Sequence, residues 1–220
     1  TLTITPRPIT LKPEDLSRTY GSANPGNAQF VLGSGSLVNG DSLKTTTVST
    51  SATTTSNAGQ TFALTSGGAE FASGNAGNYL ITYQNGTLTI TKAPLTITAT
   101  NVGKTYDGLA WSGGNGASYS GFVNGEGAGA LGGSLTFGGN AQGARNAGTY
   151  TLTPGGLSSG NYDITFVGGS LVIGKAPLTV TAVNGSKTYD GLAWNGGSGV
   201  SYSGLVNGEG AGVLSGSLNY

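Results

Sequence analysis

An internal repeat limits this chain to an array of small, similar modules. Residues 94–137 return almost unchanged as residues 177–220, which is 83 positions later. A weaker copy comes first, because the string TLTIT occurs at Thr1 and again at Thr87. The repeat predicts four segments: the last strand of a preceding module (1–7), and the first, second and third repeats (8–93, 94–176 and 177–220). The third repeat would be the first half of a module, and the chain a window from a longer repetitive protein.

Composition argues against several classes of functional site. The sequence contains no cysteine, histidine or methionine, which removes disulfides, imidazole and thiolate metal ligands, and histidine acid–base chemistry. Charged residues make up 8%, with nine basic against nine acidic, so no net field attracts nucleic acid or a membrane surface. We therefore expect no catalytic, cofactor or metal site, no nucleic-acid partner and no membrane insertion. A carboxylate pair for glycoside hydrolysis is the enzymatic alternative that remains.

Strict alternation of apolar and polar residues predicts a mainly β chain. Near the boundary of the first two repeats, the apolar residues Leu88 and Ile90 are even-numbered, whereas Leu95 and Ile97 are odd-numbered. One uninterrupted strand could not bury both pairs on the same face. We therefore predict a short Pro-containing joint at residues 92–94, where the chain turns its apolar face into the next core. Such joints leave little slack and favour an elongated rod.

Each complete repeat is also expected to contain a hairpin near its end. Strand candidates at residues 79–83 and 87–91 flank an Asn-Gly pair, which is a strong hairpin-turn signal. In the second repeat a Gly-Gly pair separates candidates at residues 161–167 and 170–173. These signals predict mainly antiparallel sheets.

The most specific string is KTYDGLAW, which stands at residues 104–111 and again at 187–194. Asp-Gly favours a turn with positive φ, and tyrosine can pack its ring while its hydroxyl reaches a partner. We interpret the motif as structural, with the aspartates accepting backbone hydrogen bonds in the turn. Its turn and core residues are Tyr106, Asp107, Gly108, Tyr189, Asp190 and Gly191.

Two alternatives give the polar residues around this motif a chemical role. In one, Asp107 and Asp190 bind calcium together with Glu126 and Glu209, although hard cations need several converging oxygens. In the other, a lysine and an asparagine form an intramolecular amide crosslink beside a buried carboxylate. The residues concerned would be Lys104, Asp107, Asn124 and Glu126, and their counterparts Lys187, Asp190, Asn207 and Glu209.

The two tryptophans, Trp111 and Trp194, occupy equivalent positions in the second and third repeats. An exposed indole close to Tyr119 or Tyr202 could stack on a sugar ring, which makes these four residues candidate carbohydrate contacts. The competing interpretation is that each indole closes a small core. The first repeat has no tryptophan at this position, so a sugar site would be confined to the later repeats.

Several strings together resemble a known family. KTYDGLAW, NAGTY at residues 146–150, GNY at 160–162 and LVIGKAPLTV at 171–180 are similar to MBG and YDG modules. These are "mostly β-grasp" repeats of very large secreted bacterial adhesins related to filamentous haemagglutinin. The first repeat, with Tyr20-Gly21, resembles the MBG type and the later two the YDG type. The resemblance covers essentially the whole chain and implies tandem β-grasp-like modules joined end to end.

The resemblance also implies a function, a location and partners. The chain is expected to be a structural stalk or spacer of a secreted, bacterial cell-surface adhesin that supports cell–cell or cell–matrix adhesion in biofilms. Its partners would be the neighbouring modules of the same long chain. Two alternatives are multivalent binding of extracellular polysaccharide through weak sites, and self-association with a like molecule through exposed sheet edges.

Overall fold

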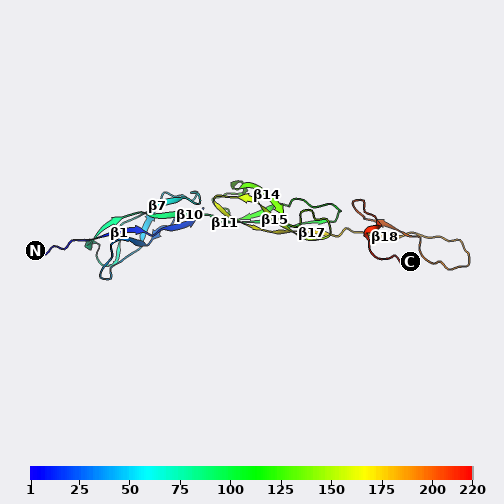
Figure 1. Cartoon of the computed structure of the whole chain (residues 1–220), viewed down its shortest axis with the longest axis horizontal. Helices are drawn as coiled ribbons and strands as arrows, with labels where there is room; N and C mark the ends of the chain where they lie inside the picture. The colour runs from blue at the N-terminus through cyan, green and yellow to red at the C-terminus, as the bar shows by residue number, and fades with distance from the viewer. Residues whose placement is uncertain (220) are drawn as a thin grey trace. The chain divides into compact units, whose positions relative to one another are not determined.

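The computed structural model describes residues 1–219 and consists mainly of β-strands, as predicted (Figure 1). The helical segments of these residues are three short 3₁₀ turns: η1 (Ala76–Asn78), η2 (Ala128–Ala130) and η3 (Ala211–Val213). Within the described residues, no helix is long and apolar enough to cross a membrane.

The first repeat folds into two main sheets and a short ribbon. One sheet has the strand order β4-β1-β9, the other has the order β2-β10-β7-β6-β3, and the ribbon pairs β5 with β8. The strands are β1 (Arg7–Pro13), β2 (Leu16–Thr19), β3 (Asn27–Ala28), β4 (Phe30–Ser34), β5 (Ser42–Leu43), β6 (Thr46–Ser49), β7 (Thr61–Ser66), β8 (Phe71–Ser73), β9 (Tyr79–Tyr83) and β10 (Gly86–Thr91).

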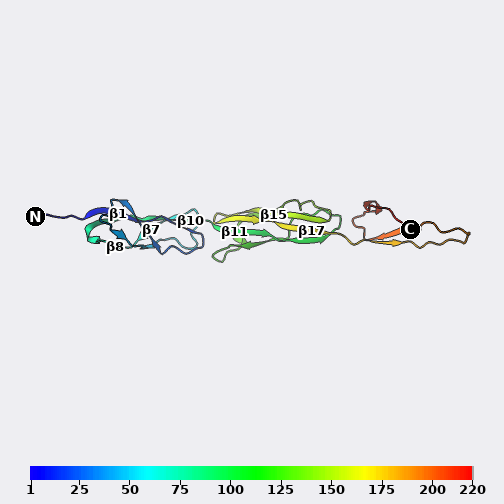
Figure 2. The same cartoon turned by 90° about the horizontal axis from the view of Figure 1, so that it is seen from below.

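The second repeat has a matching arrangement, with sheets ordered β13-β11-β16 and β12-β17-β15-β14. Its strand β17 pairs in parallel with β12 and antiparallel with β15. Figures 1 and 2 show β15 and β17 side by side. The third repeat contributes one antiparallel pair, β18 with β19. These strands are β11 (Ala93–Ala99), β12 (Val102–Thr105), β13 (Ala117–Ser120), β14 (Gly132–Gly138), β15 (Gly148–Ser158), β16 (Tyr162–Val167), β17 (Gly169–Gly174), β18 (Thr179–Ala182) and β19 (Val200–Ser203).

The predicted hairpins are wrong, because the consecutive strands at the end of each repeat lie in different sheets. Strand β9 pairs in parallel with β1, and β10 pairs in parallel with β2. The segments β1–β2 and β9–β10 therefore run alongside one another and change sheets together. In the second repeat β16 and β17 likewise belong to different sheets. The sheets are consequently mixed, although most of the strand pairs in the described residues are antiparallel, as predicted.

A glycine at the start of the last strand permits this crossing. A Cβ atom on Gly86 would lie 2.5 Å from the carbonyl oxygen of Pro13, and a Cβ atom on Gly169 would lie 2.6 Å from that of Ala99. Neither glycine has a positive φ. The Asn-Gly and Gly-Gly pairs thus mark a close approach of two backbones. Such an approach is a common reason for glycine in a strand when its φ is not positive.

Burial changes parity between the first and second repeats. Leu88 and Ile90 in β10 are 0% and 1% exposed, and Leu95 and Ile97 in β11 are 1% and 0% exposed. A single residue separates the two strands. The chain therefore passes directly from one sheet into another, while the role of proline as a stiff joint stays a prediction.

The chain divides into two compact units that combine parts of successive repeats. One unit comprises Thr1–Thr96, Tyr119–Ser134 and Leu157–Thr165, and the other comprises Ile97–Ser118, Leu135–Gly156 and the residues from Phe166 onward. The first unit has a core around Ile9, Leu11 and Tyr79. The second has a core of Ala99, Ala141, Ala144, Leu152, Leu171 and Ile173. Segments from two repeats therefore meet within a single unit.

Candidate functional site: a tyrosine–carboxylate clasp between repeats

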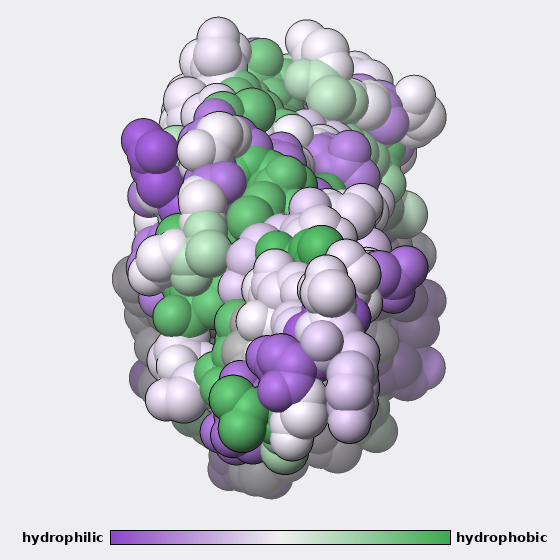
Figure 3. Space-filling view, turned by 90° about the vertical axis from the view of Figure 1, so that its right-hand side faces the viewer, coloured by the Kyte–Doolittle hydropathy of each residue, from purple (hydrophilic) through white to green (hydrophobic). Residues whose placement is uncertain are grey.

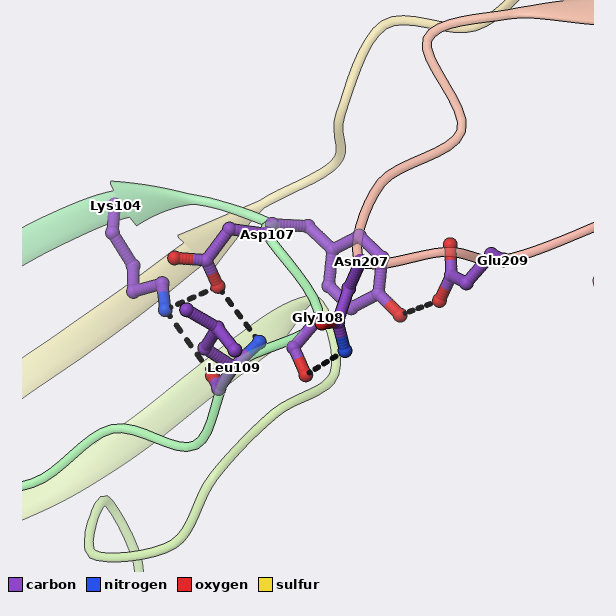
Figure 4. Close-up of polar contacts among 7 residues, drawn as sticks. Lys104, Asp107, Gly108, Leu109, Asn207 and Glu209 are labelled. Atoms are coloured by element: carbon purple, nitrogen blue, oxygen red, sulfur yellow. Dashed lines mark hydrogen bonds and ion pairs between the residues drawn. The ribbon is translucent and has the colours of Figure 1, made fainter.

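The Tyr-Asp-Gly motif of the second repeat forms a tight turn held by its own polar groups (Figure 4). Oδ1 of Asp107 accepts hydrogen bonds from the Leu109 backbone N–H at 2.9 Å and from Nζ of Lys104 at 2.6 Å. Gly108 adopts a φ of +73°, which favours glycine. The Lys104 ammonium, followed by the Leu109 N–H, holds the pKa of Asp107 below its ordinary value. These hydrogen bonds within the motif therefore rigidify the turn.

The third repeat builds the same turn. The Leu192 N–H donates to Oδ1 of Asp190 at 2.9 Å, and Nζ of Lys187 lies 2.7 Å from the same oxygen. In the first repeat Arg18 replaces the lysine and is 7% exposed. Its guanidinium donates to Oδ1 of Asn24 at 2.7 Å and also to the carbonyl oxygen of Thr53. A cation next to the motif thus organises the local chain in every repeat.

The turn of the second repeat docks on a loop of the third (Figure 4). The hydroxyl of Tyr106 donates to Oε1 of Glu209, and Nδ2 of Asn207 donates to the carbonyl oxygen of Gly108 at 3.3 Å. A Cβ atom on Gly108 would lie 2.6 Å from Cβ of Asn207. Glycine is therefore required here both for its conformation and for the approach of the loop.

The turn of the first repeat docks on the second in the same way. The hydroxyl of Tyr20 donates to Oε1 of Glu126 at 2.5 Å. A Cβ atom on Gly21 would lie 2.3 Å from Cγ2 of Val123, and Nδ2 of Asn124 donates to the carbonyl oxygen of Thr54 at 3.2 Å. We call this pairing of a Tyr-X-Gly turn with the carboxylate of the following repeat the tyrosine–carboxylate clasp.

A second tyrosine completes the clasp at Glu126. The hydroxyl of Tyr162 donates to Oε2 of Glu126 at 2.5 Å and accepts the Val123 N–H at 3.1 Å. The Tyr162 ring meets the Tyr20 ring edge to face, with centroids 5.7 Å apart. The bond to Glu126 raises the pKa of Tyr20, while burial followed by the same carboxylate raises the pKa of Tyr162. Both phenols are thus held in their neutral, donating form.

The carboxylate stands on a turn that all three repeats share. The turns are Val-Asn-Gly-Asp at residues 38–41 and Val-Asn-Gly-Glu at 123–126 and 206–209. Their asparagines have φ values of 55°, 55° and 51°, and the glycines that follow have 73°, 72° and 74°. Positive φ at both central residues is the signature of a type I′ turn. This rigid turn fixes the position of the acidic side chain that follows it.

The clasp was not predicted. The tyrosines were expected in the turn and core of their own repeat, and Tyr106 is partly buried against that core. Its partnership with Glu209 was missed, because the two residues are 103 positions apart. The available signal was the joint recurrence of Tyr-X-Gly, Val-Asn-Gly-Asp/Glu and Gly-Asn-Tyr in successive repeats.

The candidate sugar contacts lie in different surroundings. Trp111 is half-buried against the core of its unit, and its Nε1 donates to the carbonyl oxygen of Gly113 at 3.1 Å. Trp194 is 51% exposed. The centroid of the Tyr119 ring lies 5.8 Å from that of the Phe122 ring. Tyr119 belongs to one compact unit and Trp111 to the other. Carbohydrate binding by these residues stays a prediction.

Tyr202 and Trp194 line separate hollows of the same unit. Tyr202 lies beside Leu178 and Val180, whereas Trp194 lies beside Val183. On the face shown in Figure 3, hydrophobic residues reach the surface in several patches between polar ones. Trp194 and Tyr202 therefore face different hollows, and a sugar contact at either residue stays a prediction.

The residues expected to bind calcium or to form the crosslink are not assembled into a site among the described residues. Among residues 1–219, no group of three or more acidic side chains is placed to hold a metal ion. Nζ of Lys104 donates to Asp107 and to the Leu109 carbonyl oxygen, and the amide of its expected crosslink partner Asn124 donates to the Thr54 carbonyl oxygen. The atoms that would form the crosslink therefore have other partners.

Comparison with known proteins identifies the repeats. The model of the family described as MBG domain (YGX type) matches residues 9–89 and again residues 95–172. One family model thus matches both the copy with Tyr20-Gly21 and the copy with Tyr106-Asp107-Gly108, and a separate YDG type for the later copies stays a prediction. No curated protein and no solved structure shows a significant match.

Proposed function

This chain belongs to the MBG domain family, YGX type, and on that premise we propose that it is a structural stalk or spacer segment of a large secreted bacterial surface adhesin. In that role it supports cell–cell or cell–matrix adhesion in biofilms. The proposal assigns the chain a mechanical role and no chemical reaction. Tandem modules of one structural family support it.

The recurrence of the clasp at successive repeat boundaries carries this proposal. Tyr20 reaches Glu126 and Tyr106 reaches Glu209, so the same contact occurs twice between side chains more than 100 positions apart. A spacer must keep its modules in order when load acts along the chain. A polar contact that crosses each boundary, together with a glycine that excludes any side chain at the contact, meets this need.

Force spectroscopy on the whole chain, held at its two ends, tests the mechanical role. We expect separate unfolding events for the two compact units, and a lower first unfolding force in Tyr20→Phe and Glu126→Gln, because both residues lie in one unit. Tyr150→Phe is the matched control, because the Tyr150 hydroxyl donates to the Asn146 carbonyl oxygen within one repeat. A chain that extends without resistance would contradict the proposal.

Antibody labelling tests the location. An antibody raised against residues 1–219 should bind intact cells that produce the parent protein. Binding only after the cells are permeabilised would exclude a surface role.

A further inference from the structure

The Val38–Asp41 loop of the first repeat has the geometry of a clasp with one tyrosine missing. Oδ2 of Asp41 accepts the Tyr79 hydroxyl at 2.7 Å, and that hydroxyl accepts the Val38 N–H at 3.1 Å. The Tyr162 hydroxyl has the same two partners in Glu126 and Val123. In the second repeat the other carboxylate oxygen binds Tyr20 of the preceding repeat. Within residues 1–219, no tyrosine donates to Oδ1 of Asp41.

The segment before the first repeat also lacks its packing partners. Residues 1–5 have the sequence TLTIT, as do residues 87–91. Leu88 and Ile90 are 0% and 1% exposed within their sheet, whereas Leu2 and Ile4 are 89% and 87% exposed. The same string is therefore a buried strand in one place and an exposed segment outside any strand in the other.

The third repeat shows a turn with no partner among the described residues. Tyr189 is 94% exposed, whereas Tyr20 is 4% exposed within a clasp. The turn at Tyr189 nevertheless has its Asp190 hydrogen bond to the Leu192 N–H, and Gly191 has a φ of +77°. A Tyr-X-Gly turn thus forms without its carboxylate partner and is preorganised to dock.

We propose that the Val38–Asp41 loop is a docking site for the Tyr-X-Gly turn of a further MBG repeat that leads into residues 1–7 of the same polypeptide. The arriving tyrosine donates its hydroxyl to Oδ1 of Asp41. The glycine of its turn lies against the loop, as Gly21 lies against Val123 and Gly108 against Asn207. The inference rests on the proposed function, because it extends the clasp to one more boundary.

A chain lengthened by one repeat tests this proposal. A copy of residues 94–169 is added directly before Thr1, because position 169 corresponds to Gly86, which precedes the second TLTIT string. A Ser112→Ala mark in the added copy distinguishes its peptides by mass. Tetranitromethane then nitrates accessible tyrosines, and peptide mass spectrometry gives the nitration rate at each position. Circular dichroism of every variant verifies the fold.

We expect the added Tyr106 to be nitrated at least several-fold more slowly than Tyr189 in the same molecule. Asp41→Asn should raise its rate toward that of Tyr189, and Asp41→Glu should preserve the protection. Equal rates at the added Tyr106 and Tyr189, or protection that is indifferent to Asp41→Asn, would overturn the inference.

Tyr20 separates this inference from the proposed function. If Tyr20 is protected while the added Tyr106 is not, the docking at Asp41 is wrong and the clasp remains. If Tyr20 is also nitrated as fast as Tyr189, the clasp itself and the proposed function are both wrong.

Discussion

The hydroxyl of Tyr20 donates a 2.5 Å hydrogen bond to Oε1 of Glu126, although the two residues are 106 positions apart. Tyr20 belongs to the Tyr-X-Gly turn of the first repeat, and Glu126 belongs to the Val-Asn-Gly-Glu turn of the second. Both lie in one compact unit. The boundary between these two repeats is therefore a folded interface.

Removing the Tyr20 hydroxyl should destabilise the unit that contains this interface. We expect Tyr20→Phe to lower the free energy of unfolding by about 1.5–3 kcal/mol, the usual effect of losing a hydrogen bond to a charged group. The double variant with Glu126→Gln should lose less than the sum of the two single variants, which a double-mutant cycle in urea would measure. Additive losses, or an equal loss in the local control Tyr150→Phe, would contradict a direct coupling.

Two glycines in equivalent turns offer a matched test of the docking contact. Gly108 and Gly191 have φ values of +73° and +77°, so alanine costs backbone strain of about 1 kcal/mol at either position. Only at Gly108 would the new Cβ meet another residue, at 2.6 Å from Cβ of Asn207, since a Cβ added to Gly191 would have nothing within 4 Å. Gly108→Ala should therefore lower the urea midpoint more than Gly191→Ala. Equal midpoints would show that the turn does not press against the loop.

The crossing of strands at Gly86 predicts a further intolerance. Gly86→Ala places a methyl group 2.5 Å from the Pro13 carbonyl oxygen and should destabilise the first repeat by about 1–3 kcal/mol. Gly68→Ala is the control, because its Cβ would meet nothing within 4 Å and its φ is not positive. Thermal unfolding followed by circular dichroism measures both. A stable Gly86→Ala variant would favour the hairpin that the structure excludes.

The clasp tyrosines predict a loss of stability at alkaline pH. The carboxylate bonds raise the folded-state pKa values of Tyr20 and Tyr106 above the ordinary value of 10.0. A raised folded-state pKa gives stability that is fully present below pH 10.0 and is lost as pH rises through the folded pKa. Melting temperatures should fall above this pH, and less steeply in Tyr20→Phe. An identical slope of melting temperature against pH in that variant would show that Tyr20 does not contribute to the loss of stability.

Carbohydrate binding can be tested through the two indoles. Trp194 is 51% exposed, whereas Trp111 packs against the core and is less exposed. Acrylamide should therefore quench the emission of Trp111→Phe, which retains Trp194, more strongly than that of Trp194→Phe. Titration with purified bacterial exopolysaccharides would then reveal a sugar site as a saturable change in emission that Trp194→Phe abolishes in a folded chain. Emission indifferent to every polysaccharide would leave the indoles with a packing role.

Local features of the fold were predictable from the sequence. The alternation that buries Leu88 and Ile90, and the change of parity that buries Leu95 and Ile97, are visible because strand burial follows a period of two. The positive φ at Gly108 follows from Asp-Gly for the same local reason. Repetition of these patterns also identified the modules.

Contacts between distant segments were decided only by the tertiary structure. The Asn-Gly pair ending at Gly86 is compatible with a hairpin or with a backbone crossing, and the parallel pairing of β10 with β2 selects the crossing. Tyr106 and Glu209 each have an unremarkable local setting, and their partnership exists because one turn docks on the next repeat. The repeats, their strands and their turns could thus be predicted from the sequence, because these depend on neighbouring residues. The tertiary structure determined strand order and the clasp, because both depend on residues that only folding brings together.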